Sequence, residues 1–175
     1  MDHTFPKRKT TRLRGYDYNS KGACFLTICT KDRKCILSKI EPFDQAISDM
    51  PSTVLTPYGK TVEKVLGQMN KHYEHLSVDH YVIMPNHVHI LLQILVDGPS
   101  GTPVPTEKTV TPQNTYVAKF VSAFKRFCNR EYGRNVWQAR SFDHVIRGKE
   151  DYEIHRTYIY ENPLKWQYDE MYTDQ

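Results

Sequence analysis

Alternating apolar and polar positions predict a set of short strands along the chain. The first is GACFLTICT at 22–30, which is rich in β-branched and aromatic residues. Two more, HYVIM at 80–84 and HVHILLQI at 87–94, are separated only by a Pro-Asn pair that suits a tight turn. A shorter strand, SFDHVIR, follows at 141–147. The middle two strands therefore predict a β-hairpin.

Apolar residues at helical spacing predict three helices. The first carries an apolar stripe made by Val62, Val65, Leu66, Met69 and Tyr73. The second runs from about 115 to 130, with its aromatic residues inward and most of its basic residues outward. The third runs from about 150 to 162, where Pro163 ends it. The stripe of the first helix should cover one face of a sheet.

Proline and glycine mark the connections between these elements. Residues 1–15 predict a flexible basic arm, and residues 42–57 predict a turn-rich connection with a short helix near Gln45. Residues 96–114 hold four prolines and two glycines without periodicity, which is typical of a mobile loop. We expect residues 16–175 to form one domain that this loop interrupts without dividing it.

The order of the predicted elements is strand, helix, two strands, helix, strand, helix. This order, with a hairpin in the middle, fits an α+β ferredoxin-like sandwich, in which helices cover one face of an antiparallel sheet and a last helix follows. The length of 175 residues, 39% of them hydrophobic, leaves room for one compact domain and little more.

Three further features of the composition limit where the protein works. No stretch approaches the roughly 18 to 20 apolar residues that cross a bilayer, and the N-terminus lacks the apolar core of a signal peptide. The four cysteines, Cys24, Cys29, Cys35 and Cys128, form no CxxC pair and are interpreted as reduced, mostly buried thiols. We therefore expect a cytoplasmic protein.

The net charge of +4 is small, but the basic residues are gathered in two clusters. The N-terminal cluster consists of Lys7, Arg8, Lys9, Arg12 and Arg14, and the helical cluster consists of Lys119, Lys125, Arg126, Arg130 and Arg134. A phosphate backbone attracts such clusters, because neutralising phosphates releases condensed counterions. A solvated surface is an equally good explanation of either cluster alone.

A pair of histidines in the second hairpin strand indicates a metal site. His87 and His89 are two residues apart, and residues i and i+2 of a strand project to the same face. Both imidazoles can therefore reach one metal ion while Val88 faces the other way. An HxH pair alone is more often incidental than functional, so the motif needs a partner elsewhere in the chain.

The last helix offers that partner in Tyr158 and Asn162, which are four residues apart and share a face. Tyr160 is rotated by about 200° from Tyr158 at 3.6 residues per turn and must point elsewhere. His155 lies near the same face as Tyr158. Taken without the histidine pair, Tyr158 would be explained better as a core aromatic and Asn162 as a helix-end residue before proline.

Together these segments resemble the REP-associated tyrosine transposases of bacteria, a branch of the HUH class. The resemblance covers most of the chain through GACFLTICTKDR, MPNHVHILL, VWQARSFDHVIR and YIYENP, in the order of the family. It implies that His87 and His89 are metal ligands, that Tyr158 is the nucleophile and that Asn162 is the third ligand. Related insertion-sequence transposases usually carry glutamine where this chain has Asn162, and the asparagine matches the REP-associated branch.

The resemblance also implies a reaction and a substrate. The protein would cleave and rejoin single-stranded or hairpin DNA through a 5′-phosphotyrosine, with Mg²⁺ or Mn²⁺ bound, as a monomer or a homodimer. Trp137, Phe142 and Tyr132 are candidates for base stacking, worth about 1 to 3 kcal/mol per base. Core packing explains Trp137 and Phe142 at least as well.

Three other functions compete with this interpretation. A noncatalytic nucleic-acid-binding module of the same fold would need aromatic residues on an exposed sheet face and no metal. A rolling-circle replication initiator would often have two tyrosines one helical turn apart, which Tyr158 and Tyr160 are not. A metal-dependent hydrolase would use water as the nucleophile and Tyr158 as a structural residue.

Overall fold

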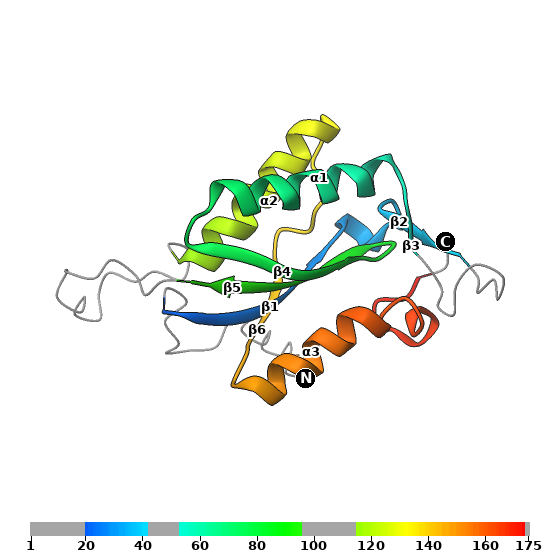
Figure 1. Cartoon of the computed structure of the whole chain (residues 1–175). Helices are drawn as coiled ribbons and strands as arrows, with labels where there is room; N and C mark the ends of the chain where they lie inside the picture. The colour runs from blue at the N-terminus through cyan, green and yellow to red at the C-terminus, as the bar shows by residue number, and fades with distance from the viewer. Residues whose placement is uncertain (1–19, 42–52, 96–114, 174–175) are drawn as a thin grey trace, which may run out of the picture.

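The computed structural model describes residues 20–41, 53–95 and 115–173 (Figure 1). The predicted arm at 1–15, the short helix near Gln45 and the loop at 96–114 lie outside the described residues.

Within the described residues, four strands form an antiparallel sheet in the order β4-β5-β1-β6. Their bounds are Gly22–Cys29 for β1, Leu76–Ile83 for β4, His87–Ile94 for β5 and Phe142–Val145 for β6. The hairpin between β4 and β5 closes where the Met84 amide donates to the carbonyl of His87 (2.9 Å), so the predicted two-residue turn is confirmed. This strand order, with the first and third strands of the sheet in the centre, is that of the predicted ferredoxin-like fold.

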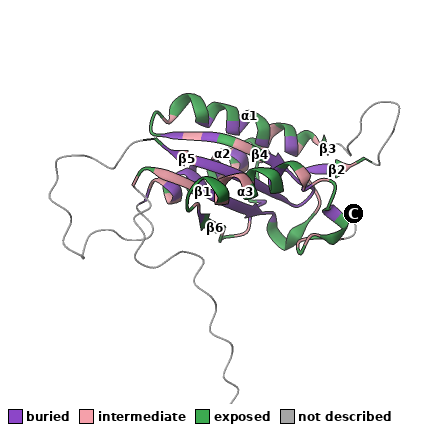
Figure 2. Cartoon of the chain, turned by 60° about the horizontal axis from the view of Figure 1, so that its bottom comes forward, coloured by how far each residue is buried: buried purple, intermediate pink, exposed green. Residues whose placement is uncertain are grey.

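The described α-helices lie on both faces of the sheet (Figure 1). Their bounds are Pro57–His72 for α1, Tyr116–Tyr132 for α2 and Lys149–Glu161 for α3. α1 and α2 cover one face, and α3 lies against the other (Figures 1 and 2). Because β5 is central and covered on both sides, nearly all of its residues are buried, including the polar ones.

Local sequence explains where α1 and α2 begin and end. The hydroxyls of Thr56 and Thr115 accept hydrogen bonds from Gly59 N and Ala118 N, which satisfies a free amide at each N-terminus. α2 ends at Gly133, whose φ of 67° lies in the left-handed region that glycine adopts without strain.

The sheet separates two apolar clusters of unequal size. The larger cluster fills the space between the sheet and the pair α1 and α2. The smaller cluster lies on the α3 side and consists of Phe25, Val82, Met84, Leu91, Ile159 and Trp166. Of the residues of α3, all of which are described, only Ile159 is buried. α3 therefore packs on the sheet through a small apolar contact.

A second, two-stranded sheet was not predicted. β2 (Ser38–Ile40) and β3 (Thr53–Leu55) pair antiparallel beside the start of α1. Cys24, Cys29 and Cys128 are buried and Cys35 is half-buried, as predicted for thiols that pack in a core. None of the described helices is both long and apolar enough to span a bilayer.

Candidate functional site

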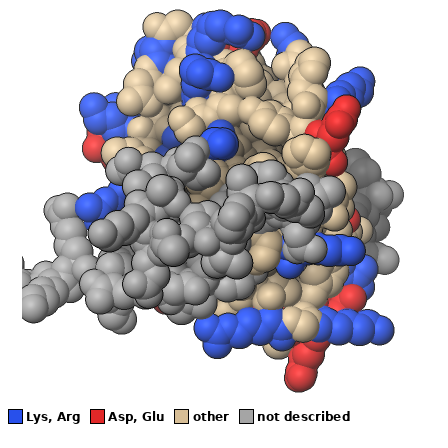
Figure 3. All heavy atoms as spheres, turned by 90° about the vertical axis from the view of Figure 1, so that its left-hand side faces the viewer, with Lys and Arg blue, Asp and Glu red and all other residues tan. Residues whose placement is uncertain are grey.

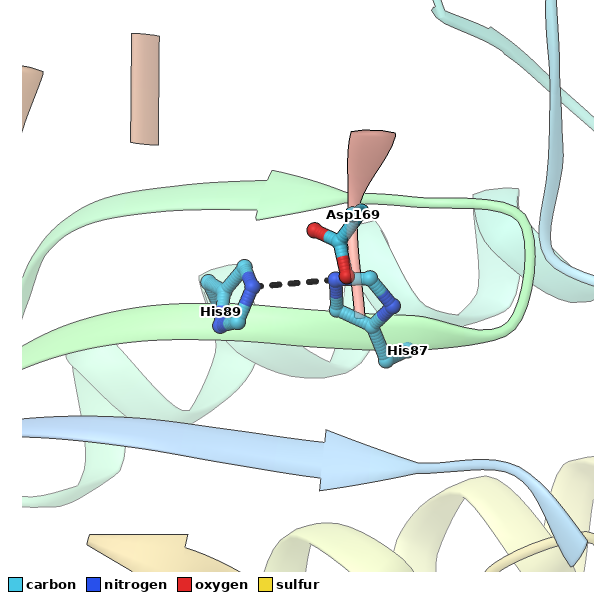
Figure 4. A group of neighbouring side chains, drawn as sticks. All are labelled: His87, His89 and Asp169. Atoms are coloured by element: carbon cyan, nitrogen blue, oxygen red, sulfur yellow. Dashed lines mark hydrogen bonds between the residues drawn. The ribbon is translucent and has the colours of Figure 1, made fainter. Parts of the chain in front are cut away.

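His87 and His89 project from β5 toward the face of the sheet that α3 covers, as their spacing predicted. Their Nε2 atoms lie 2.9 Å apart and both side chains are almost fully buried (Figure 4). The Nδ1 atom of His87 lies 2.8 Å from Asn86 Oδ1, and that of His89 lies 2.9 Å from Thr27 Oγ1. Partners of this kind on the second ring nitrogen fix the orientation of metal-binding histidines.

Burial keeps both imidazoles neutral at physiological pH. It lowers the pKa of His87 to about 4, although the carboxylate of Asp169 opposes this shift. The pKa of His89 lies well below its ordinary value, first because of burial and then because of the neighbouring His87. A neutral imidazole has a free lone pair, which is the form that binds a metal ion.

Tyr158 and Asn162 reach the same place from α3. The ring of Tyr158 lies edge-on to that of His89, with 5.2 Å between the ring centroids. The hydroxyl of Tyr158 and the amide nitrogen of Asn162 both donate to Asp169 Oδ2, at 3.3 Å and 3.2 Å. Tyr160 points away and is 66% exposed. The four residues selected from the sequence are therefore neighbours in the structure.

Asp169 is a member of the site that the sequence did not reveal. Its carboxylate and the imidazole nitrogens of His87 and His89 all lie within 4.8 Å of one another (Figure 4). Asp169 follows a short 3-10 helix, Trp166–Tyr168, and its Oδ1 accepts from the amide of Met171 (2.7 Å). Because this segment is irregular, no periodic pattern marked the residue.

The arrangement of donor atoms fits a divalent metal ion. The Oδ1 atom of Asn162 is buried and has no hydrogen-bond partner in suitable geometry among the described residues. A buried amide oxygen without a partner is costly, unless a donor or a cation meets it. The set of donors consists of two imidazole nitrogens, this amide oxygen and a carboxylate. Such a mixed set suits Mn²⁺, and its two oxygen donors also suit Mg²⁺.

Tyr158 is a protonated phenol in this arrangement. Burial raises its pKa above the ordinary value, and the negative charge of Asp169 raises it further. At 40% exposure its ring lies between the buried histidines and the surface. Removal of the phenolic proton must therefore accompany any attack by this oxygen.

The exposed basic residues of α2 that were predicted to bind DNA lie apart from this site. Lys119, Arg126 and Arg130 are exposed on α2, the layer that lies across the sheet from α3. Figure 3 shows Lys and Arg side chains on the upper layer, which α1 and α2 form, and on the lower layer, which α3 forms. The N-terminal cluster, Lys7, Arg8, Lys9, Arg12 and Arg14, lies outside the described residues.

Lys125, a predicted DNA-binding residue, turns toward the protein instead of projecting outward. Its ammonium group donates to the backbone carbonyls of Gln138, Ala139 and Arg140, at 2.8, 3.3 and 3.3 Å. Burial lowers the pKa of Lys125 to about 8. This lysine holds the segment after α2 in place.

The prediction that Trp137 stacks on bases is wrong. Its side chain is 2% exposed and packs against Phe124 in the larger cluster, with 5.3 Å between the ring centroids. Phe142 is exposed and keeps a ring available, whereas the hydroxyl of Tyr132 donates to the carbonyl of Tyr58 (2.6 Å). Core packing, the alternative that the sequence left open for Trp137, is the one that the structure supports.

Comparison of the sequence with those of known proteins finds relatives in bacteria. No family model matches the chain. An uncharacterised protein of Haemophilus influenzae is 29% identical over 95% of this chain and 94% of its own length. A second protein of that species, provisionally named a REP-associated tyrosine transposase, is 27% identical over 75% of this chain and 74% of its own length. The REP-associated tyrosine transposase of Escherichia coli is 27% identical over 51% of this chain and 45% of its own length. The chain is related to the REP-associated tyrosine transposases.

A solved structure supports the fold. It is a REP-associated tyrosine transposase bound to a REP hairpin, and it superposes with a TM-score of 0.56 over 88% of this chain and 73% of that chain. At 20% identity the likeness bears on the fold, and the predicted α+β class is confirmed.

Proposed function

We propose that this protein is a metal-dependent endonuclease and strand transferase that acts on single-stranded or hairpin DNA. The observation that carries the proposal is that the Tyr158 hydroxyl lies beside the paired imidazoles of β5 and the buried oxygen of Asn162, which has no hydrogen-bond partner in suitable geometry among the described residues. A phenol beside a site for a divalent ion suits attack on a phosphodiester. The relatives that bear the transposase name support the same reaction.

His87, His89, Asn162 and Asp169 would hold the ion. When bound, the ion would supply Lewis acidity toward a phosphate oxygen and offset negative charge in the transition state. Asp169 adds a carboxylate that is already within reach of both imidazoles. The side-chain oxygens of Thr27 and Asn86 orient the imidazole rings by contacting the Nδ1 atoms of His89 and His87.

Tyr158 is the proposed nucleophile. Its oxygen loses a proton and attacks phosphorus, a bond from this oxygen to phosphorus forms, and the bond from phosphorus to the 3′ oxygen breaks. The departing 3′ oxygen takes up a proton, and the 5′-phosphate stays on Tyr158. Because the new bond is still a phosphodiester, the 3′-hydroxyl of another strand can attack it and release Tyr158. Cleavage and joining are thus one reaction in two directions.

The position of the phenol restricts the substrate. Tyr158 is half-exposed beside a buried histidine pair, so a phosphate must come close to the sheet to meet both. A strand free of its complement can approach in this way, whereas stacked duplex DNA would keep its phosphates along a rigid, wide rod. A REP hairpin, which the solved relative binds, is the proposed class of substrate.

The experiment that tests the proposal compares wild type with Tyr158→Phe on a labelled hairpin oligonucleotide with Mn²⁺. We expect wild type to carry the label on denaturing gels and the variant to carry none, because phenylalanine removes only the attacking oxygen. Tyr160→Phe is the matched control, two residues away on the exposed side, and it should form the adduct at the wild-type rate.

The outcomes separate tyrosine attack from hydrolysis. Cleavage at equal rates by wild type and Tyr158→Phe, with no labelled protein in either, would show that water attacks. The hydrolase interpretation would then replace the proposed strand transfer. Label that persists on Tyr158→Phe would assign the nucleophile to another residue.

A further inference from the structure

A second group of metal-binding side chains lies between β6 and the first half of α3. It consists of His144 on β6 and of Asp151 and His155 on successive turns of α3, and their ligand atoms lie within 4.8 Å of one another. None of these residues belongs to the candidate active site. The described part of the chain thus contains two separate groups of this kind.

We propose that His144, Asp151 and His155 bind a Zn²⁺ ion that fastens α3 to the edge of the sheet. Two imidazoles and one carboxylate form a set that zinc uses, with water completing the coordination. Asp151 Oδ1 lies 3.2 Å from His144 Nε2 and 3.1 Å from His155 Nδ1. Ligands about 2.0 to 2.1 Å from a tetrahedral ion are about 3.3 Å apart, so the spacing already suits the ion.

The surroundings of the group favour a cation. With neutral imidazoles, the group carries one negative charge from Asp151. The other oxygen of Asp151 accepts from the amide of Arg147 (2.7 Å), which fixes the direction of the carboxylate. The side chains are 49%, 22% and 19% exposed for His144, Asp151 and His155, so water can reach the open coordination position.

The two imidazole rings are already brought together. The rings of His144 and His155 stack with 4.6 Å between centroids and 18° between planes, and Phe25 closes the inner side at 4.8 Å from His155. His155 Nδ1 also lies 2.8 Å from the backbone carbonyl of Asp151, and this contact would yield to the bond with zinc. Because stacked rings direct their lone pairs along nearly parallel planes, the two imidazoles would turn toward each other to share the ion.

The ion would have a structural effect on the helix of the active site. α3 carries Tyr158 and is followed directly by Asn162, but within its own bounds it buries only Ile159. His155 lies one turn before Tyr158 along the same helix. A zinc ion that joins β6 to α3 would thus fix the upstream half of a helix whose apolar seat is narrow.

The test measures zinc binding to untagged, metal-free protein by isothermal titration calorimetry, and Co²⁺ absorption reports the coordination. We expect wild type to bind two equivalents of Zn²⁺, one at each of the two groups. His144→Ala should bind one equivalent, and it should fold as wild type does because His144 is exposed. Asp151→Asn should weaken the same equivalent by about tenfold or more. His80→Ala removes a histidine from β4 beside Asp79 and is the matched control, with two equivalents expected.

Variants of the active site make the result independent of the proposed function. The double variant His87→Ala with His89→Ala should still bind one equivalent of Zn²⁺, at His144, Asp151 and His155. Zinc should still raise its melting temperature, because that ion joins β6 to α3. Adding His144→Ala should remove both the bound zinc and the rise in melting temperature. If His144→Ala and Asp151→Asn bind zinc as wild type does, the group is only a hydrogen-bonded network and the proposal is wrong.

Discussion

Single residues on β1 set the geometry of the candidate metal ligands. Thr27 lies opposite His89 in the pairing of β1 with β5, and its hydroxyl lies 2.9 Å from His89 Nδ1. The sequence predicted that the two histidines share a face, because strand alternation is local. It did not predict their partners, since Thr27 is 62 residues away and its register depends on the whole sheet.

We predict that Thr27→Val lowers the affinity for Mn²⁺ by about tenfold to a hundredfold, because the methyl group cannot hold the imidazole of His89. Calorimetric titration measures this affinity. Thr61→Val is the control, since its hydroxyl bonds only within the first turns of α1. Equal affinities in the two variants would mean that other contacts orient His89.

The buried histidines should also make stability depend on pH. Burial lowers the pKa of His87 to about 4 in the folded protein, whereas an unfolded chain has a value near 6.5. Between these values the unfolded state binds more protons, so acidification favours unfolding. More than about one pH unit above 6.5 neither state is protonated at this residue, and the effect vanishes.

We predict that the free energy of unfolding in metal-free buffer falls between pH 6.5 and 4, by as much as about 3 kcal/mol from His87. Urea unfolding at several pH values measures the slope. His87→Asn should flatten it, whereas His72→Asn on the exposed side of α1 should not. A slope that His87→Asn leaves unchanged would assign the pH dependence to other groups.

At the scale of elements, regular patterns were predictive and irregular ones were not. β5 has the predicted bounds, His87–Ile94, because the Pro-Asn pair at 85–86 marks where it begins. β4 begins at Leu76 rather than His80, since the pairing shifts between Val78 and His80 and breaks the alternation. β2 and β3 have three residues each, which is too short for any period to show.

The start of α1 illustrates a constraint that only packing reveals. A side-chain carbon on Gly59 would lie 2.1 Å from the backbone oxygen of Leu37. That oxygen accepts from both the amide (3.0 Å) and the hydroxyl (2.9 Å) of Thr56, so it cannot move aside without cost. The close approach of α1 to Leu37, just before β2, therefore depends on glycine.

We predict that Gly59→Ala destabilises the protein by roughly 2 kcal/mol, in the range of overpacked substitutions. Gly67→Ala, on the same helix with nothing within 4 Å, should instead stabilise it by about 0.5 to 1 kcal/mol. Denaturant unfolding measures the free energy of unfolding of the two variants and of wild type. A Gly59→Ala protein as stable as wild type would show that the backbone at Leu37 can shift.

At the scale of the molecule, the candidate site is built between layers. β5 supplies the histidines from the sheet, and α3 with the segment after it supplies Tyr158, Asn162 and Asp169. The sequence could identify each motif by its own period but not the irregular Asp169. It also could not show which layer the basic residues of α2 occupy, because that depends on how the helices cross the sheet.

The basic residues of α2 lie across the sheet from the candidate site, so a short strand held there cannot touch them (Figures 1 and 3). A hairpin stem is long enough to continue around the edge of the sheet and meet them. We predict that replacing Lys119, Arg126 and Arg130 by alanine weakens hairpin binding. The slope of log affinity against log salt should fall by about 2 to 3, since each duplex phosphate contact contributes about 0.9.

The same triple variant should form the Tyr158 adduct with a short single strand at the wild-type rate, because such a strand reaches only the α3 side. Fluorescence anisotropy at several salt concentrations measures the slope, and denaturing gels measure the adduct. Replacing Lys60, Lys64 and Lys71, on the exposed side of α1, by alanine controls for the loss of three positive charges. If the salt slope for the hairpin is unchanged, the helical cluster is only a solvated surface. If the variant loses as much activity on the short strand as on the hairpin, the charge of the cluster acts at a distance rather than by contact.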